Sequence, residues 1–377
     1  MKIRFRPSLQ LLAKTRIALR FLLKIDCRIV CTNFPGALGG MESIYVAYMH
    51  QCEHCLPLEV TIKRNIASII RALATEVTRW YDCHRNLLPD ASLDYWKMIC
   101  WYSHGTIDYF ATARALLQNE NLNRRQRYIL ICKYCLEGEQ RLSEELTADD
   151  LIFISINAGL TKDLRTWMEA LRSNTTLNWK QITDQVDTGN YHTKNPRNIF
   201  SVDYLGLLYY FPKLTNAEVR YRCLYLAILH GSIRPFYLYL CFARLPDYEV
   251  DDLFNRFPLR HRYLVIENFL QWPLQCMFLS IIERFRRRIW NQIYLDLFKF
   301  ILFERFERGQ LEYEYLSLLK QFWAQLSENS RGLIMDDRLY ARIAYVMKFN
   351  DQYNITPNLI ELYIKSGEAW QDQVVLI

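Results

Sequence analysis

Residues 127–138 have the sequence RYILICKYCLEG, and the spacing of their apolar side chains decides the predicted fold class. The apolar positions follow the intervals i, i+3, i+4, i+7 and i+8, which place them on one face of an α-helix. Gly138 then supplies the flexible backbone that commonly ends a helix. The apolar positions are Tyr128, Ile131, Cys132, Cys135 and Leu136.

A second stretch, RYRCLYLAILHG at residues 220–231, has the same intervals, and Gly231 stands where Gly138 stands in the first. The two Arg-Tyr pairs lie 93 residues apart, and a poorer third copy begins 42 residues later at Arg262, with Pro273 in place of the glycine. These distances fit two units and one unit of a repeat of about 42 to 47 residues, the length of a helical hairpin in an α-solenoid. We therefore predict an all-α fold of degenerate helical-hairpin repeats that form an α-solenoid.

Further helical stripes are predicted nearer the C-terminus. Apolar side chains recur at helical intervals over residues 294–302, before Gly309, and over residues 315–326. Residues 173–198 are polar and contain both Gly189 and Pro196, so we predict a linker or a long loop there. It would separate N-terminal helical repeats at residues 41–172 from C-terminal helical repeats at residues 199–377.

Composition excludes several classes of protein. Of the 377 residues, 51% are hydrophobic, so the chain can bury a large core and is not expected to be disordered. Its 12 glycines and 11 prolines are too few for a β protein with frequent turns. The common phosphate, dinucleotide, serine-hydrolase and zinc-protease signatures are absent from the sequence.

Short local pairs do not indicate an enzyme either. Cys83 and His84 are neighbours in sequence, but catalytic partners meet in space, so this adjacency does not place a base against the thiol. Adjacent aspartates such as Asp149 and Asp150 are expected to cap helices or to face water. We predict no enzymatic activity and no cofactor.

Positive charge is concentrated at the N-terminus. Residues 1–25 contain seven lysines and arginines and no acidic residue, whereas the remaining 352 residues have 40 basic and 40 acidic side chains. We expect residues 1–40 to form a basic segment outside the fold, with a mitochondrial targeting helix or a helix on an anionic membrane surface as alternatives. The neutral body argues against the general phosphate attraction of a nucleic-acid-binding protein.

The number of cysteines indicates that the protein resides in a reducing compartment. Eleven cysteines are too few for a disulfide scaffold in a chain of this length, and their number is odd, so we predict a reducing, cytoplasmic environment. Mitochondrial import through the basic N-terminus is the alternative. No uncharged run is long enough to span a bilayer. The nearest candidate, residues 223–243, is interrupted by Arg234 and Pro235, so no transmembrane segment is predicted.

Four potential zinc ligands lie within six residues, at His50, Cys52, His54 and Cys55. Zinc sites use four nitrogen or sulfur ligands, and a C-x-x-C pair supplies two of them. Cys132 and Cys135 form a second pair, but they already belong to an apolar helix face. Since cysteine is often buried, we predict structural roles for these residues and keep a zinc-stabilised module as an alternative.

The strongest basic cluster outside the N-terminus is Arg284-Phe285-Arg286-Arg287-Arg288. Aligned with Arg256, Arg260 and Arg262 upstream and with Arg305 and Arg308 downstream, it would form a stripe for RNA or another anion, with Phe285 available to stack on bases. Interleaved acidic residues, including Glu283 and Glu304, favour ion pairs on a solvated face instead. RNA or anion binding through Arg284, Arg286, Arg287 and Arg288 is therefore the alternative function.

Residues 100–139, CWYSHGTIDYFATARALLQNENLNRRQRYILICKYCLEGE, resemble the repeat unit of uncharacterised helical-repeat, loosely ankyrin-like proteins of spiders and related arthropods. The resemblance implies helical repeats and assigns no catalytic residue. The ankyrin tetrapeptide T-P-L-H is absent, which argues against true ankyrin hairpins. Because an α-solenoid presents a long concave face that usually holds another protein, we predict a non-enzymatic protein-binding scaffold whose partner the sequence does not identify.

Overall fold

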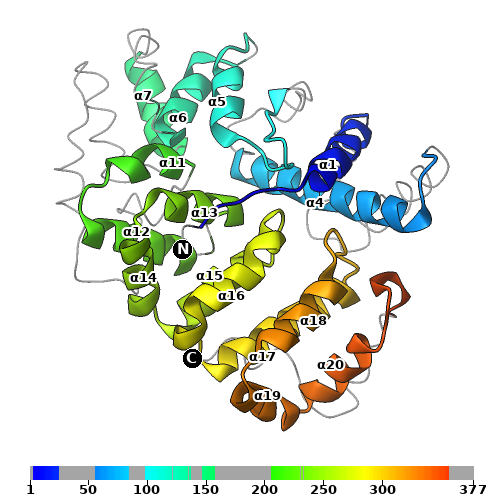
Figure 1. Ribbon diagram of the computed structural model, residues 1–377. Coiled ribbons are helices and arrows are strands. Elements are labelled where there is room, and N and C mark those ends of the chain that lie inside the picture. Colours follow the sequence, from blue (N-terminus) through cyan, green and yellow to red (C-terminus); the bar gives the residue numbers. More distant parts are fainter. Residues whose placement is uncertain are drawn as a thin grey trace. The chain divides into compact units, whose positions relative to one another are not determined.

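The computed structural model describes residues 3–24, 56–84, 98–120, 122–134, 136, 147–157, 205–229, 231 and 233–355. These residues are mostly helical, and they contain no β-strand beyond a single bridge between Trp101 and Ile107 (Figure 1). The prediction of an all-α fold is therefore confirmed. Among the helices that the structure describes, every one is too short or too polar to span a lipid bilayer.

The chain divides into two compact units. Unit 1 comprises Met1–Thr75, Ser103–Gly105 and Phe254–Ile377, and unit 2 comprises Glu76–Tyr102 and Thr106–Leu253. This division differs from the predicted one, because both ends of the chain contribute to unit 1. The predicted linker at residues 173–198 lies outside the described residues.

The C-terminal part of unit 1 is a series of short helices in which helices two apart in sequence pack on one another. Contacts join α15 to α17, α16 to α18, α17 to α19 and α18 to α20, and Figure 1 shows α16, α18 and α20 side by side. The odd-numbered helices are thus connected in one row and the even-numbered helices in another. The elements are α15 (Leu259–Asn268), η4 (Leu274–Met277), α16 (Phe278–Phe285), η5 (Arg286–Arg288), α17 (Asn291–Lys299), the π-helix η6 (Phe300–Glu307), α18 (Tyr315–Gln325), α19 (Glu328–Met335), α20 (Leu339–Met347) and η7 (Gln352–Asn354).

Both apolar stripes predicted in this region are buried. Gly309 follows the first stripe with a φ of +60°, the left-handed conformation that ends many helices. Phe322 in the second stripe contacts Phe298 in the first, with ring centroids 4.5 Å apart. The buried residues are Tyr294, Leu297, Phe298, Ile301 and Leu302 in the first stripe, and Tyr315, Leu318, Leu319, Phe322 and Leu326 in the second.

The basic N-terminal helix is also part of unit 1. Helix α1 (Leu9–Leu22) begins at Ser8, whose Oγ accepts a hydrogen bond from the Leu11 N–H at 3.1 Å. Ala18 and Leu22 are fully buried, while the basic side chains of Arg16, Arg20 and Lys24 are exposed. The expectation that residues 1–40 lie outside the fold is therefore wrong for residues 3–24, because the helix has a small apolar face that packs.

Helix α4 (Val60–His84) begins in unit 1 and ends in unit 2. Its first half is tied to the segment after η6 by two long-range hydrogen bonds. Arg71 Nη1 donates to the Arg308 carbonyl oxygen at 2.8 Å, and Asn65 Nδ2 donates to the Leu311 carbonyl oxygen at 3.3 Å. The N-terminal and C-terminal parts of unit 1 are thus held together by polar contacts as well as by apolar packing.

Unit 2 contains the two stretches that predicted the fold class. They form α6 (Arg124–Tyr134) and α12 (Ala217–Leu229), and Gly231 has a φ of +59° after α12. Burial extends beyond one stripe, to Ile129 and Leu130 on α6, whereas Cys135 and Gly138 lie outside the described residues. The other described helical elements are α5 (Tyr109–Leu117), α7 (Ala148–Asn157), α11 (Leu207–Tyr210), η3 (Phe211–Lys213), α13 (Pro235–Arg244) and α14 (Asp247–Arg256), whose last residues belong to unit 1.

Gly105 is required by the close packing inside unit 1. It has a φ of +86°, and a Cβ built there would lie 2.5 Å from Leu73 Cδ2 and 2.8 Å from Thr15 Cγ2. We expect Gly105→Ala to lower the free energy of unfolding by about 1–3 kcal/mol, through backbone strain and the clash together. Thermal unfolding measures this loss.

Gly332 on α19 provides the matched control. It is helical, and a Cβ there would meet nothing within 4 Å, so Gly332→Ala should increase stability by up to about 1 kcal/mol. If the two alanine variants changed the unfolding temperature in the same direction, the packing of Gly105 against α1 and α4 would be contradicted.

Candidate functional site

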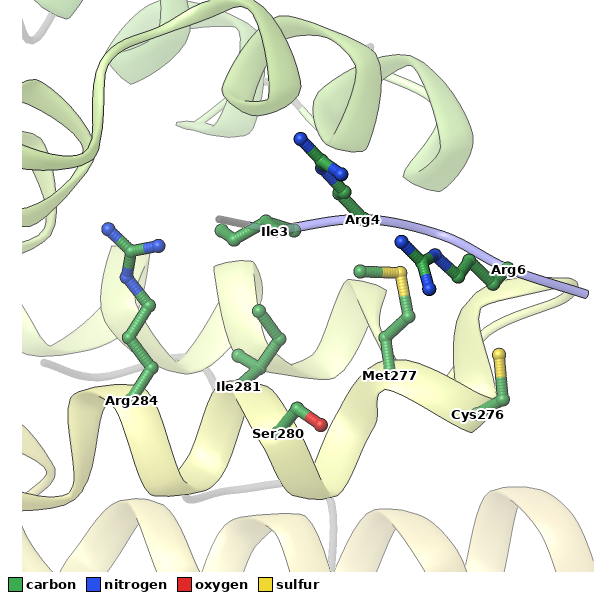
Figure 2. A pocket seen from close by; sticks show the side chains of 8 residues that line it. All are labelled: Ile3, Arg4, Arg6, Cys276, Met277, Ser280, Ile281 and Arg284. Carbon is green, nitrogen blue, oxygen red and sulfur yellow. The ribbon is translucent and has the colours of Figure 1, made fainter. Parts of the chain in front are cut away.

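One side of α16 faces a pocket. Met277, Ser280, Ile281 and Arg284 follow the intervals i, i+3, i+4 and i+7, so they share one face of a helical segment that starts in η4 and continues as α16. Met277 and Ile281 are buried, whereas Arg284 is half-buried. Figure 2 shows Met277, Ile281 and Arg284 pointing from the helix toward the N-terminal segment.

The N-terminal segment at residues 3–6 runs along this face of α16, in the opposite direction to the helix (Figure 2). Ile3 is buried, and the half-buried Phe5 ring lies edge-on to His104 with the ring centroids 5.1 Å apart. Arg4 and Arg6 are exposed. The alternation of apolar and basic residues therefore anchors the segment on the fold and leaves its guanidinium groups accessible.

An open pocket of about 210 Å³ lies between the segment and the helix. Ile3, Met277 and Ile281 form its apolar middle, and Figure 2 shows the guanidinium group of Arg284 at one end and that of Arg6 over Met277. No acidic side chain is among the described residues that line it, which also include Arg4, Cys276 and Ser280. The pocket thus combines an apolar floor with three positive charges.

No described carboxylate neutralises the charges of the N-terminal segment. Within the described part of the chain, neither Arg4 nor Arg6 forms an ion pair with a carboxylate. A guanidinium group presents a planar fork of N–H donors that matches a carboxylate or a phosphate. The chemistry of this pocket is therefore that of a binding site for a ligand that has both anionic and apolar groups.

The predicted arginine cluster at residues 284–288 divides between different roles. Arg284 lines the pocket, whereas Arg286 donates to the Gln325 carbonyl oxygen at 3.0 Å and lies 3.6 Å from the Glu283 carboxylate. Arg287 is exposed and Arg288 is half-buried, both on η5. The structure therefore brings Arg284 together with Arg4 and Arg6 around the pocket, and it ties Arg286 to the fold.

Phe285 does not offer a surface for stacking on bases. Its side chain is 1% exposed, and its ring stacks on that of Phe254 with 3.8 Å between the centroids. The expected stacking role is wrong because Phe285 lies on the buried side of α16. Upstream, Arg262 donates to the backbone carbonyl oxygens of Asn255, Phe257 and Arg288, so it also serves the fold.

The candidate zinc ligands His50, Cys52, His54 and Cys55 lie outside the described residues. Cys132 is fully buried on α6, in agreement with the structural role that its position in the apolar face predicts. In the described ranges, no group of three or more His, Cys, Asp or Glu side chains is placed to hold a metal ion.

Cys83 and His84 have separate partners. His84 is fully buried, with Nδ1 2.6 Å from the Trp80 carbonyl oxygen and Nε2 2.7 Å from the Tyr134 hydroxyl. Arg234 Nη2 donates to the Cys83 sulfur at 3.3 Å. These contacts occupy both ring nitrogens of His84 with groups other than the thiol.

Asp150 caps a helix, as its position predicts. It lies in the first turn of α7 and accepts hydrogen bonds from the backbone N–H of Thr147 at 3.0 Å and from its hydroxyl at 2.8 Å. Asp150 also forms an ion pair with Arg125. The backbone hydrogen bond first, and then the Arg125 side chain, lower the pKa of Asp150 to about 2.

Arg4 and Arg6 were not predicted as members of a site. They are separated from α16 by most of the chain, so no spacing within one element connects them to Arg284. The available signal was the alternation Ile3-Arg4-Phe5-Arg6, which is typical of an extended segment with one covered and one exposed side.

Compared with known proteins, the chain matches no family model, and it has no significant match among curated proteins or solved structures. The resemblance of residues 100–139 to arthropod helical-repeat proteins stays a prediction.

Proposed function

We propose that this chain is a non-enzymatic, protein-binding scaffold of helical repeats that holds an acidic group of its partner in the arginine-lined pocket. The observation that carries the proposal is the pocket, in which three arginines surround an apolar floor and no described lining residue is acidic. Arginine pairs with carboxylates in a bidentate geometry and is frequent among the residues that dominate protein interfaces.

The packing within unit 1 supports the proposed solenoid arrangement. In an α-solenoid each helical hairpin stacks on the next, so helices two apart in sequence pack together, as α15 to α20 do. Helices α15, α17 and α19 begin at intervals of 32 and 37 residues. The proposed repeat is therefore shorter here than the 42 residues that separate Arg220 from Arg262.

A cytoplasmic location is part of the proposal. Cys223 and Cys241 are buried free thiols, and burial raises the pKa of both, so they are protonated and pack as small apolar groups. Such cysteines suit a reducing compartment. The buried face of α1 supports this location over mitochondrial import, since a targeting helix needs its apolar face free.

RNA binding is the alternative function, and specific contacts count against it. Proteins that bind single-stranded RNA stack its bases on aromatic side chains. Phe285 is covered by Phe254, and the described residues that line the pocket include no aromatic ring. Arg286 and Arg287 are the exposed cluster arginines that an RNA backbone would meet outside the pocket, and Arg286 already contacts Gln325 and Glu283.

We expect the purified full chain to bind a fluorescent polyglutamate peptide, and the double substitution Arg6→Glu with Arg284→Glu to weaken this binding at least tenfold. A hydrogen bond between charged groups contributes about 1.5 kcal/mol or more, which is roughly tenfold in affinity. Fluorescence anisotropy at constant salt measures the change. Arg287→Glu is the matched control, because this arginine is exposed but does not line the pocket. The affinity of this variant for the peptide should stay within about twofold of that of the natural chain.

A polyglutamate affinity that the double substitution leaves unchanged would overturn the proposal. Tight binding of a single-stranded RNA of equal charge, abolished by Arg287→Glu, would support the alternative function instead.

A further inference from the structure

The arrangement of charges along the pocket specifies more than an anion. Figure 2 shows the guanidinium group of Arg284 at one end of the pocket and that of Arg6 over Met277, with Ile3 and Ile281 between them. A single compact anion reaches one of these guanidinium groups. A ligand that uses the whole pocket has two anionic groups separated by an apolar group.

The length of the pocket limits the separation of those groups. Its helical wall runs from Cys276 to Arg284, which is about 12 Å at a rise of about 1.5 Å per residue. An extended peptide rises about 3.3 Å per residue, and its side chains at positions i, i+2 and i+4 point to the same side. Positions i and i+4 are then about 13 Å apart, which matches the wall.

The volume of the pocket fits the middle position of such a peptide. A space of about 210 Å³ is smaller than the pockets that hold whole cofactors, and it accepts one aliphatic side chain against Ile3, Met277 and Ile281. An RNA backbone supplies regularly spaced phosphates but no aliphatic group between them. The apolar floor therefore favours a peptide over a nucleic acid.

On this basis we infer that the pocket recognises an extended acidic peptide segment of the form acid–x–aliphatic–x–acid, in which the two carboxylates pair with Arg6 and Arg284. The inference rests on the proposed protein-binding function and names the chemistry of the partner segment. The carboxylates fix the ends of the segment, and the aliphatic side chain enters the space between them.

Three fluorescent peptides with identical flanking residues and equal net charge test the inference on the full chain. The first contains the core Glu-Ser-Leu-Ser-Glu, the second replaces its leucine with serine, and the third shortens the spacing to Glu-Leu-Glu. We expect the first peptide to bind at least tenfold more tightly than the other two. Arg6→Gln and Arg284→Gln should each remove most of this preference, whereas Arg287→Gln should preserve it.

The outcomes separate this inference from the proposed function. Equal binding of all three peptides that still depends on Arg6 and Arg284 would overturn the peptide pattern and leave a general acidic-partner pocket standing. Binding of none of the peptides would overturn both. Binding of a single-stranded RNA in their place, lost in the Arg6→Gln and Arg284→Gln variants, would also overturn both.

Discussion

Replacing Glu312 with alanine is expected to lower the free energy of unfolding by about 3–5 kcal/mol, because it leaves the buried charge of Arg305 without its nearest carboxylate. The two side chains are 9% and 4% exposed, and Arg305 Nη1 lies 3.6 Å from Glu312 Oε1. Breaking one partner of a buried ion pair costs far more than breaking an exposed pair, since water cannot replace the lost contact. Urea unfolding of the full chain measures the effect.

The surroundings of Glu312 explain why the loss should be large. Gln275 Nε2 donates to Glu312 Oε1 at 3.0 Å, and the Tyr315 hydroxyl lies 2.8 Å from the same oxygen. Gln275 and Tyr315 are also buried. Tyr315 would keep the Leu270 carbonyl oxygen as an acceptor at 3.0 Å, but the Gln275 N–H that bonds to Glu312 would lose an acceptor that solvent does not replace. Arg305 lies on the π-helix η6, with its guanidinium carbon 4.8 Å from the centre of the Phe300 ring.

Two further variants make the prediction specific. Glu283 pairs with Arg286 at 3.6 Å, and both side chains are exposed, so Glu283→Ala should change stability by no more than about 1 kcal/mol. The double variant Arg305→Met with Glu312→Leu removes both buried charges and should be more stable than Glu312→Ala alone. A Glu312→Ala variant as stable as Glu283→Ala would contradict the role of the buried ion pair.

The sequence predicted the parts of the fold that depend on one element. Helical spacing identified the buried faces at residues 294–302 and 315–326, because each face packs along a continuous stripe of its own helix. It also predicted ion pairs one turn apart, such as Arg308 Nη1 with Glu304 Oε2 at 2.8 Å. Such local patterns follow from helix geometry alone.

The sequence could not predict contacts between distant segments. Arg305 was grouped with an exposed arginine stripe, but the fold buries it beside Glu312 and Tyr315 at the end of η6. The N-terminal segment was expected outside the fold because its charge is unbalanced. Its burial depends on a few small or apolar side chains, including Ile3 and Ala18, whose partners lie far away in the sequence.

The pocket depends on one feature that the sequence predicts and on one that it does not. The spacing of Met277, Ile281 and Arg284 along α16 is visible in the sequence, but the arginines that complete the pocket come from residues 3–6. The distribution of charge in the sequence identifies two basic regions, residues 1–25 and residues 284–288, but does not connect them. Only the packing of the N-terminal segment along α16 joins them into one site.

His84 gives the other large expected effect, through the pH dependence of stability. The Trp80 carbonyl oxygen only accepts hydrogen bonds, so the proton of the neutral ring is on Nδ1, and the Tyr134 hydroxyl donates to Nε2. Burial is the main cause that lowers the pKa of His84 to about 4. The charges of Lys133 and Arg234 act in the same direction, and the bond to the Trp80 carbonyl opposes them.

We expect the free energy of unfolding to fall as the pH drops from 6.5 toward 4. Unfolded His84 takes up a proton near pH 6.5, whereas folded His84 stays neutral until about pH 4. Its contribution is therefore fully present above pH 6.5 and is lost as the pH falls, by about 2 kcal/mol at pH 5 and about 3 kcal/mol in total. His104 in unit 1, whose pKa burial also lowers to about 4, adds a loss in the same direction.

Urea unfolding at pH 7.5 and at pH 5.0 measures this loss, and His84→Gln isolates the contribution of His84. Glutamine keeps a donor and an acceptor but does not titrate, so the variant should lose less stability between the two pH values, with the remainder assigned to His104. The comparison uses the change with pH in each protein, so a constant cost of the substitution does not affect it. If the variant and the natural chain lost equal stability on acidification, folded His84 would have to titrate near its ordinary pKa, which its burial between Trp80 and Tyr134 does not permit.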